Sequence, residues 1–356
     1  MTSRRPTISD VARAAGVSLG AVSFALNGRP GVAPETRDRI LAAAKELGWT
    51  PSHRARALAA SRALAVGLVI ARPPETLGSD PFFTEFIAGI GLALAPLGQS
   101  LLLQVEPDRE RELAGYRRLA AEGRVDGVFL TDLRVGDPRP ALLAEVGLPA
   151  VWIGPDCVGS SLPCVAVDDR PGIVAAVAHL VELGHQRIAH VAGPDEFVHG
   201  VSRREAWAGA LKAAGLPEGP CVRSDFSAQG GADATKVLLD LADPPTAIVY
   251  ANDLMAIAGM AAAAARGFDV PRDLSITGFD DTEVTGHLQP ALTTVHTDAY
   301  AWGKAAAEQL VAVIDGRETS NADLPPPHLV IRASTAPPRS SPLSHTPNRS
   351  THEPDH

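Results

Sequence analysis

The strongest constraint on the fold is a regular alternation of short apolar segments with longer helical ones, which begins at Ala65. AVGLVI, SLLLQV, DGVFL and AVWIG have the length and the composition of buried strands, and stretches with helical periodicity separate them. This alternation is typical of a parallel sheet whose strands are joined by crossover helices. The rhythm starts again after PCVAVDD, so the sequence predicts two consecutive doubly wound α/β lobes.

The first fifty residues have helical periodicity without a strand-like segment. TISDVARAA begins with Thr7 and Asp10 at the spacing of a capping box, and Gly16 ends this helix. Ser18 is a favourable N-cap for a second helix, because its hydroxyl accepts a hydrogen bond from a free backbone amide. The second helix is expected to end in the NGRPG segment.

A third helix is expected after Pro34 and should end at Gly48. Its predicted inward side chains are Ile40, Ala43, Ala44 and Leu47. Three helices joined by a tight turn and a loop within fifty residues are typical of a helix-turn-helix module. The sequence therefore predicts an all-α DNA-binding head in front of the α/β body.

GVSLG, at residues 16–20, also fits the G-x-S-x-G pattern of a hydrolase nucleophile elbow. That elbow requires a strand before the serine, so that the hydroxyl stands exposed above a parallel sheet. A helix precedes Ser18 here. We therefore interpret the segment as the turn of the head and predict no catalytic residue.

Charge separates the head from the body. Residues 1–62 contain ten Arg or Lys and four Asp or Glu, a net charge of +6, whereas the whole chain carries −9. The remaining residues therefore carry −15. An acidic body with a basic head restricts phosphate binding to the head.

The cysteines and the apolar segments indicate a cytoplasmic protein without a membrane partner. Cys157, Cys164 and Cys221 are an odd number and have neither C-x-x-C nor zinc-like spacing, which argues against a disulfide framework. The N-terminus lacks the apolar core of a secretion signal, and no stretch has the ~18 uncharged apolar residues of a membrane span.

An enzyme and a transport-type sugar receptor are the two alternative classes of protein. GIGLAL at 89–94 begins like a dinucleotide fingerprint, but Leu94 replaces the third glycine, and the histidines lack metal-ligand spacing. We therefore predict no cofactor and no metal, and interpret His179, His185, His190 and His199 as packing or surface residues. A transport-type sugar receptor would share the two lobes but would need a signal peptide and would lack the basic head.

Several motifs in a fixed order resemble the lactose-repressor-like (LacI/GalR) family of bacterial transcription regulators, over residues 6 to about 335. They include TISDVARAAGVS, AVSFALNGRPGVAPETRDRI, PFFTEFIAGI, VAVDD, HLVELGHQRIAHVAGP, YANDLMAIAGM and SITGFDDTEV. The resemblance implies a regulator, expected to be a repressor, that binds double-stranded DNA at a pseudo-palindromic operator as a nucleoid-associated homodimer. It also implies a small-molecule effector, expected to be a sugar.

The family fold implies a periplasmic-binding-protein-like body whose chain crosses three times between the lobes. The head would span 1–50 and a hinge helix or linker 51–63, followed by the effector-binding and dimerisation domain at 64–336. Within that domain the first lobe would comprise about 64–167 and 297–325, and the second about 168–295 and 328–336. Residues 337–356 are polar and proline-rich and lack leucine heptads, so we expect a disordered tail and no tetramer.

The predicted DNA-reading helix carries no charge, which is unusual because Arg and Lys supply the commonest base contacts. By motif position Leu19, Gly20 and Phe24 resemble base-contacting residues, although many relatives have threonine and arginine where this chain has Ala21 and Phe24. Phe24 could instead pack inside the head. The complete set of predicted DNA contacts is Thr7, Ser18, Leu19, Gly20, Ala21, Ser23, Phe24, Asn27, Arg29, Arg54 and Leu58.

HRARALAA at 53–60 resembles the family's hinge helix, and Leu58 matches its minor-groove leucine wedge. Such a wedge unstacks and kinks the duplex at a cost offset by new contacts. A flexible basic linker is the alternative interpretation.

Polar residues follow the predicted strands of the second lobe, where open α/β sheets bind ligands. Asn252 follows AIVYA, Asp280 follows SITGF, and Arg203 lies after RIAHVAG in a loop that opens the next helix. From position alone, Asn252 or Asp280 could equally be a helix cap, and Arg203 a solvated charge.

The resemblance places Arg203, Asn252 and Asp280 at ligand-contacting motif positions. Together they can donate to and accept from vicinal hydroxyls, which suits a sugar, whereas Asp280 would repel a phosphate. In the first lobe we expect Phe83 to stack on the ligand, with a core position as the alternative, and Asp132 is a further candidate.

Overall fold

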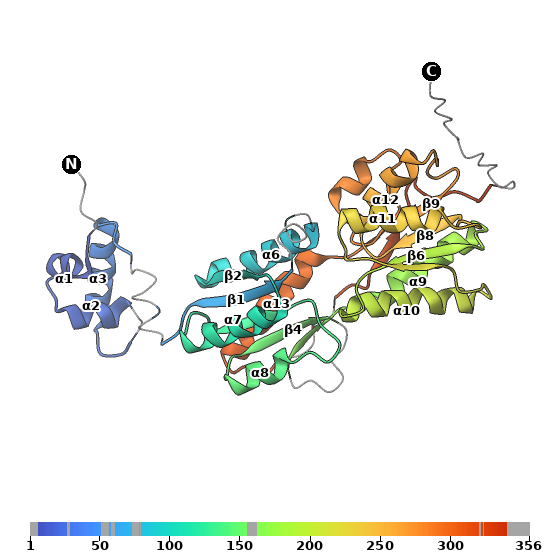
Figure 1. The fold of residues 1–356 in the computed structure, drawn as a ribbon. Helices are drawn as coiled ribbons and strands as arrows, with labels where there is room; N and C mark the ends of the chain where they lie inside the picture. Colours follow the sequence, from blue (N-terminus) through green and yellow to red (C-terminus); the bar gives the residue numbers. More distant parts are fainter. Residues whose placement is uncertain are drawn as a thin grey trace, which may run out of the picture.

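The computed structural model forms a helical head and an α/β body of two lobes (Figure 1). No helix in the described part of the chain is long and apolar enough to cross a membrane. The structure describes residues 6–26, 29–50, 57, 61–72, 78, 80–154, 162–319, 322 and 324–339.

The head consists of α1 (Ile8–Ala15), α2 (Leu19–Leu26) and α3 (Pro34–Glu46). The predicted capping box is confirmed, because the Asp10 carboxylate accepts from the Thr7 amide at 2.9 Å and from its hydroxyl at 2.7 Å. Gly16 ends α1 in the left-handed conformation, at φ +63°. The three helices close around a small core of Val11, Ala12, Ala15, Val22, Ala25, Ile40, Ala43 and Ala44.

The expected inward position of Leu47 is wrong, since its side chain is 37% exposed. The helix ends one residue earlier, at Glu46, and Leu47 is its C-cap. The chain then turns at Gly48, with φ +61°, and Trp49 packs against the core instead. The prediction from helical periodicity assumed that α3 includes Leu47, but the helix ends before this residue.

The first lobe is a five-stranded parallel sheet in the order β2-β1-β3-β4-β5. Its strands are β1 (Ala65–Ala71), β2 (Ser100–Glu106), β3 (Gly127–Leu130), β4 (Ala150–Gly154) and β5 (Cys164–Ala166). Its helices are α6 (Pro81–Leu94), the short η1 (Ala95–Leu97), α7 (Arg109–Ala121), α8 (Arg139–Glu145) and α13 (Ala299–Ile314).

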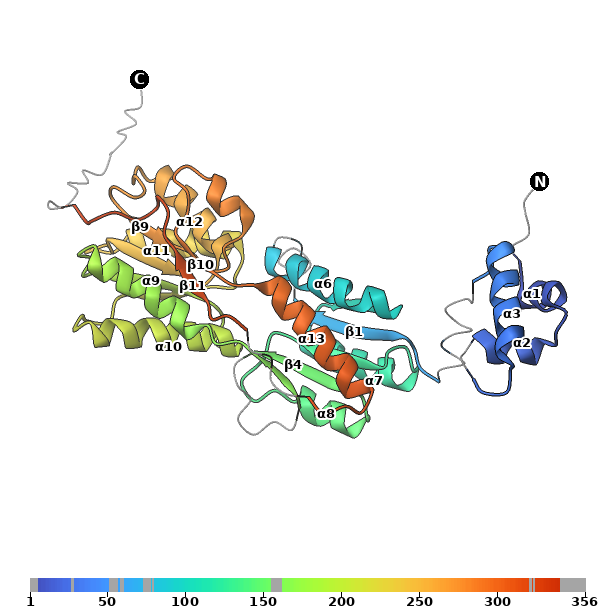
Figure 2. The same ribbon diagram turned by 180° about the vertical axis from the view of Figure 1, so that it is seen from behind.

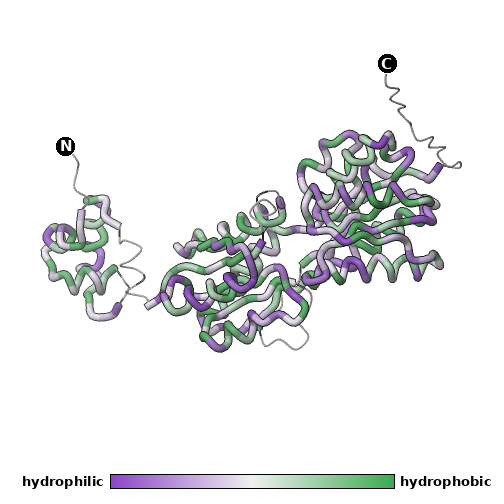
Figure 3. The backbone as a smooth tube through the Cα atoms, viewed as in Figure 1, coloured by the Kyte–Doolittle hydropathy of each residue, from purple (hydrophilic) through white to green (hydrophobic). Residues whose placement is uncertain are grey.

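Both faces of this sheet are covered. Leu68 and Ile70 of β1 pack toward α6 and α13, whereas Val69 packs toward α7 and α8. A strand buried on both faces reads as a continuous apolar run, as AVGLVI does. Figure 3 shows hydrophobic residues along these inner strands and more hydrophilic ones on the outer surface.

Helix α13 comes from the C-terminal part of the chain but lies beside α6 in the first lobe (Figures 1 and 2). Two glycines permit the close approach. A methyl group on Gly303 would lie 2.1 Å from the Phe86 carbonyl oxygen, and one on Gly89 would lie 2.1 Å from the Tyr300 carbonyl oxygen. The two backbones are therefore in direct contact.

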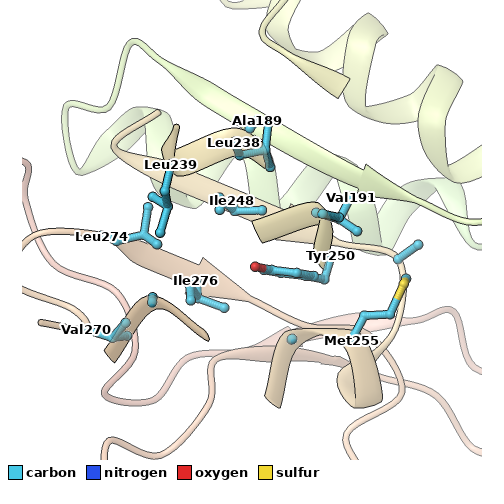
Figure 4. Close-up of a cluster of buried hydrophobic side chains, with 14 of the residues drawn as sticks. Ala189, Val191, Leu238, Leu239, Ile248, Tyr250, Met255, Val270, Leu274 and Ile276 are labelled. Atoms are coloured by element: carbon cyan, nitrogen blue, oxygen red, sulfur yellow. The ribbon is translucent and has the colours of Figure 1, made fainter. Parts of the chain in front are cut away.

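The second lobe is a four-stranded parallel sheet in the order β7-β6-β8-β9. Helices α11 and α12 cover one face around the cluster shown in Figure 4, and α9 and α10 cover the other. The strands are β6 (Ile188–Ala192), β7 (Cys221–Arg223), β8 (Ala247–Tyr250) and β9 (Ser275–Thr277). The helices are α9 (Arg170–Glu182), α10 (Val198–Ala213), α11 (Ala228–Leu239), α12 (Asp253–Ala265) and the short η2 (Glu283–His287).

A two-stranded antiparallel pair packs beside α9 in the second lobe (Figure 2). It is formed by β10 (Thr294–His296) and β11 (His328–Val330). Strand β10 leads into α13 of the first lobe, and β11 brings the chain back to the second. The chain therefore passes between the lobes after β5, after β10 and before β11.

Candidate DNA-reading head and effector cavity

Helix α2 presents an apolar surface to solvent. Leu19 is 51% exposed and Phe24 is 42% exposed, whereas Val22 and Ala25 on the other side of the helix are buried. The Ser18 hydroxyl caps this helix by accepting from the Ala21 amide at 3.2 Å. The alternative that Phe24 packs inside the head is wrong, and its ring is free to contact another molecule.

The remaining predicted DNA contacts differ in accessibility. Thr7, Gly20 and Arg29 are exposed, and Ala21 and Ser23 are half-buried. Arg37 donates to the Arg29 carbonyl oxygen at 3.0 Å, which holds the loop between α2 and α3. The predicted contacts Asn27, Arg54 and Leu58 lie outside the described residues.

A cavity lies between the two lobes, at the ends of their strands. Most of its polar residues follow the carboxyl end of a strand, where parallel α/β sheets bind ligands. It is lined by Arg72, Asp80, Phe82, Thr131, Asp132, Leu133, Ile153, Gly154, Val167, Asp169, Val198, His199, Arg203, Phe226, Asn252, Asp280 and Trp302.

Arg203 lies within α10, and not in a loop before the helix as the sequence suggested. The helix begins earlier, at Val198, whose amide donates to the Leu133 carbonyl oxygen of the first lobe at 2.8 Å. The Arg203 side chain is only 8% exposed, so the solvated-charge alternative is wrong. Its guanidinium donates to one Asp169 oxygen at 2.8 Å and stacks 3.7 Å from the centre of the Phe279 ring.

Asn252 is both a helix cap and a lining residue of the cavity. Its side-chain oxygen accepts from the Met255 amide at 3.0 Å, which caps α12. Its amide nitrogen donates to the Phe226 carbonyl oxygen at 3.1 Å. The two roles that the sequence left open therefore coexist.

Asp280 faces the cavity from a strained backbone segment. Its φ is +121° and that of Asp281 is +61°, both unusual for residues other than glycine. Within the described part of the chain no hydrogen-bond donor reaches the Asp280 carboxylate. Burial, and the neighbouring charges of Asp253, Asp80 and Asp169, raise the pKa of Asp280 well above its ordinary value despite the opposing charge of Arg203.

Asp169 offers a second acceptor. Both contacts from Arg203 go to Oδ2, at 2.7 and 2.8 Å. Its Oδ1 atom is buried and has no hydrogen-bond partner among the described residues. A buried polar atom without a partner calls for an explanation, and a bound donor in the cavity would supply one.

Asp132 lines the cavity from the first lobe, but Arg72 engages it. The Arg72 guanidinium donates to both Asp132 oxygens at 2.6 Å and lies 3.5 Å from Asp80. Burial would raise the pKa of Asp132, yet the charge and hydrogen bonds of Arg72 outweigh it and hold that pKa below its ordinary value. Arg72 also reaches the second lobe, 5.2 Å from the centre of the Phe197 ring.

The expectation that Phe83 stacks on a ligand is wrong. Its side chain is 2% exposed and belongs to the core of the first lobe. Phe83 shares the inward face of α6 with Phe86, Ile90 and Leu94, a helical spacing already visible in the sequence. The neighbouring Phe82 lines the cavity instead and packs 5.9 Å from the Trp302 ring.

His199 is a cavity residue that sequence reasoning assigned to packing or the surface. Its imidazole contacts the rings of Phe197 and Phe226, at centroid distances of 5.5 and 5.1 Å. Burial, followed by the charge of Arg203, lowers the pKa of His199 to about 3. The ring is therefore neutral and can both donate and accept a hydrogen bond.

Sequence reasoning also missed Arg72, Asp80, Asp169, Phe226 and Trp302. Asp169, in VAVDD, follows a strand-like run, a signal that could have been used. Arg72 similarly follows AVGLVIA. Phe226 and Trp302 carry no comparable signal, because only the tertiary fold brings their elements to the cavity.

The chemistry of the cavity suits a neutral, hydroxylated molecule. Both guanidiniums of the cavity are already paired, Arg72 with Asp132 and Arg203 with Asp169, so neither is left to hold an anionic ligand. No group of three or more His, Cys, Asp or Glu side chains suited to a metal occurs in the part of the chain that the structure describes.

Comparison with protein-family models gives two matches. Residues 7–52 match the lacI family of bacterial regulatory proteins, and residues 177–335 match a periplasmic binding protein-like domain. The chain is 37% identical over 344 residues to the HTH-type transcriptional regulator CelR of Thermobifida fusca, which covers 93% of this chain and 98% of CelR. It is 32% identical to the repressor CytR of Escherichia coli K12, over 92% of this chain and 96% of CytR.

Solved structures are similar over almost the whole chain. A transcriptional regulator CelR–cellobiose complex matches with a TM-score of 0.70 and 34% identity, covering 93% of this chain and 100% of that one. The Lac repressor dimer bound to operator and the anti-inducer ONPF matches with a TM-score of 0.80 and 29% identity, covering 94% and 100%.

Proposed function

The chain belongs to the lacI family of bacterial regulatory proteins, and on this premise we propose that a sugar bound between its two lobes controls the affinity of its head for operator DNA. It is a helix-turn-helix transcriptional regulator, and its relatives are regulators and not enzymes. The cavity supports the effector part of the proposal.

The observation that carries this proposal is the pairing of acceptors with aromatic rings around one cavity. The Asp280 carboxylate and Asp169 Oδ1 have no hydrogen-bond partners among the described residues, so each can accept from a ligand hydroxyl. Phe82, Phe226 and Trp302 offer apolar surfaces to the carbon-bound hydrogens of a sugar ring. A relative, CelR, has been solved with cellobiose.

Coupling to the head follows from the two-lobed lining of the cavity. A ligand that contacts Phe82 of the first lobe and Asp280 of the second binds best in one arrangement of the lobes. The linker to the head leaves the first lobe, so a change in lobe arrangement alters how the heads of two subunits are presented to DNA. The coupling is reciprocal and typically amounts to ~1–3 kcal/mol.

One head reads one half-site, so we propose a homodimer on a pseudo-palindromic operator. Leu19, Gly20 and Phe24 would meet bases and thymine methyls, and arginines of the head would neutralise phosphates. The proposed hinge at 51–63 would place Leu58 in the minor groove and Arg54 on a phosphate. The domain limits 1–50 and 64–336 belong to the same proposal.

A thermal-shift screen tests the effector class. The purified full chain is heated with cellobiose, other disaccharides and monosaccharides, with a sugar phosphate as the charged comparison. A ligand at about 100 times its Kd should add ~2.7 kcal/mol of stability and raise the Tm. A neutral sugar should do so, and the sugar phosphate should not.

The active sugar is then added to the protein with labelled operator. Operator affinity should change by the same factor by which operator changes sugar affinity. If no sugar shifts the Tm, or a sugar binds without changing operator affinity, the proposal is wrong.

A further inference from the structure

Asp253 is a buried carboxylate beside the cavity that does not line it. It is the first residue of α12, directly after Asn252, and its side chain is 1% exposed. Its backbone amide donates to the Phe279 carbonyl oxygen at 2.8 Å. Its Oδ2 atom accepts from the Thr282 amide at 2.9 Å and from the Thr282 hydroxyl at 3.3 Å.

These contacts bracket Asp280 and Asp281, the two consecutive residues with positive φ. Phe279 precedes the pair and Thr282 follows it, and both are held by the same residue. Strained backbone persists where the surroundings over-determine it, and it tends to occur at functional sites. The Asp253 backbone and carboxylate supply such a constraint at both ends.

The other carboxylate oxygen reaches strand β10, which lies in the second lobe just before the chain crosses to the first. Oδ1 accepts from the Thr294 hydroxyl at 2.5 Å, and Thr294 is the first residue of β10. Strand β10 leads directly into α13 of the first lobe. A methyl group on Gly278 would lie 2.2 Å from this same oxygen, so the glycine leaves the space that the contact needs.

We propose that Asp253 is a positioning residue for effector binding, which holds Asp280 toward the cavity and joins its loop to the strand that leads into the first lobe. The effect on sugar binding rests on the proposed function, whereas the effect on the backbone at 279–283 does not. The first is tested below as the ligand arm and the second as the backbone arm. Asp281 is held separately, by Arg332 at 2.6 Å and His296 at 3.0 Å, and the Asp280 amide donates to the Val295 carbonyl oxygen at 2.9 Å. Asp253 adds the contacts to the two residues that flank this pair, Phe279 and Thr282.

The backbone arm uses hydrogen exchange on the unliganded full chain, read on a peptide covering residues 279–283. Asp253→Ala removes the acceptor of the Thr282 amide and should speed exchange of this peptide at least about ten-fold, because the buried amide is left without a hydrogen-bond partner. Asp253→Asn keeps an oxygen for the Thr282 amide and should stay close to wild type.

Two threonines provide a matched pair of milder variants. Thr294→Val deletes the buried hydroxyl that Asp253 accepts from, and Thr235→Val deletes an equally buried hydroxyl of the same lobe that bonds Tyr250. Thr294→Val should speed exchange at 279–283 about three-fold or more, and Thr235→Val should leave it unchanged. If Asp253→Ala does not fold, the comparison of Thr294→Val with Thr235→Val tests the positioning role of Asp253.

The ligand arm measures cellobiose binding by calorimetry. Asp253→Ala should raise the Kd about ten-fold or more, and Asp253→Asn should restore it to within about three-fold of wild type. A purely structural role would lower stability in both Thr→Val variants without separating their cellobiose affinities.

The outcomes separate the two claims. If wild type binds no sugar, the proposed function fails and the exchange experiment alone decides the role of Asp253. Unchanged exchange in both Asp253→Ala and Thr294→Val overturns the positioning role, whatever the sugar result. Faster exchange with unchanged cellobiose affinity also overturns it, because Asp280 would then bind without being held.

Discussion

The head and the cavity prepare for their partners in opposite ways. The recognition helix α2 carries no charged side chain and leaves Leu19 and Phe24 exposed. In the cavity both guanidiniums are buried and already paired, Arg72 with Asp132 and Arg203 with Asp169. The apolar side chains of α2 are exposed to water, whereas the charged side chains of the cavity are already paired with one another before a ligand binds.

The difference follows from solvent exposure, because the head surface faces water and the cavity side chains are largely buried. An exposed apolar side chain costs little to display, and it gains only when a second surface excludes water from it. A buried charge without a partner costs several kcal/mol, so the cavity must satisfy its arginines internally. Acceptors that remain unpaired there, on Asp169 and Asp280, are then the groups left for a ligand.

Salt gives the largest expected contrast between the two surfaces. Raising salt from 50 to 200 mM should weaken operator binding on the order of 1,000-fold, because each phosphate contact of the basic head releases counterions. Binding of a neutral sugar should change less than about two-fold, since buried pairs are screened little. Fluorescence anisotropy with an operator selected from random duplexes, and calorimetry with the sugar, measure both. If operator affinity and sugar affinity fell by similar factors as salt is raised, the two surfaces would not differ in this way.

Removal of the Asp280 carboxylate should affect only the cavity. Asp280→Ala should weaken sugar binding at least about 100-fold, because the cavity loses a carboxyl group that no donor among the described residues engages. Operator affinity without sugar should stay within about two-fold of wild type, measured by the same anisotropy assay. Asp280→Gly, which relieves the positive φ, should give the same loss. A variant that still responds fully to sugar would place the effector elsewhere.

The exposed leucine of α2 tests the head in the same manner. Leu19→Ala should weaken the selected operator about ten-fold through lost contact with bases, and sugar affinity should not change. Leu41→Ala is the matched control, because Leu41 is 46% exposed on α3 and is not a predicted contact. Equal effects of the two substitutions would mean that exposed apolar area, and not the position on α2, determines operator affinity.

Local sequence determined much of the fold because local chemistry decides it. Thr7 and Asp10 lie three residues apart and cap α1 whatever surrounds them, and Gly16 ends that helix for a backbone reason. The strand at 65–71 was visible because burial on both faces requires a continuous apolar run. The two-lobed body and the DNA-binding head were therefore accessible to sequence reasoning.

The cavity depended on contacts between distant segments. Periodicity alone could not decide between Phe82 and Phe83, since the choice depends on how α6 lies against the sheet and α13. Arg203 looked like a loop charge because the start of α10 is set by Val198, which bonds to the other lobe. Motif resemblance pointed to Asn252 and Asp280, but it did not indicate that Asp253 contacts the residues on either side of Asp280 and Asp281.

The sequence by itself determined which elements form, which end of each sheet carries polar residues, and that the basic head is separate from an acidic body. The tertiary structure alone decided which of those polar residues meet. It paired Arg72 with Asp132 across 60 positions of the chain, brought Trp302 into the first lobe, and joined Asp253 to Thr294. Such pairings depend on packing between elements far apart in sequence, and no local pattern specifies that packing.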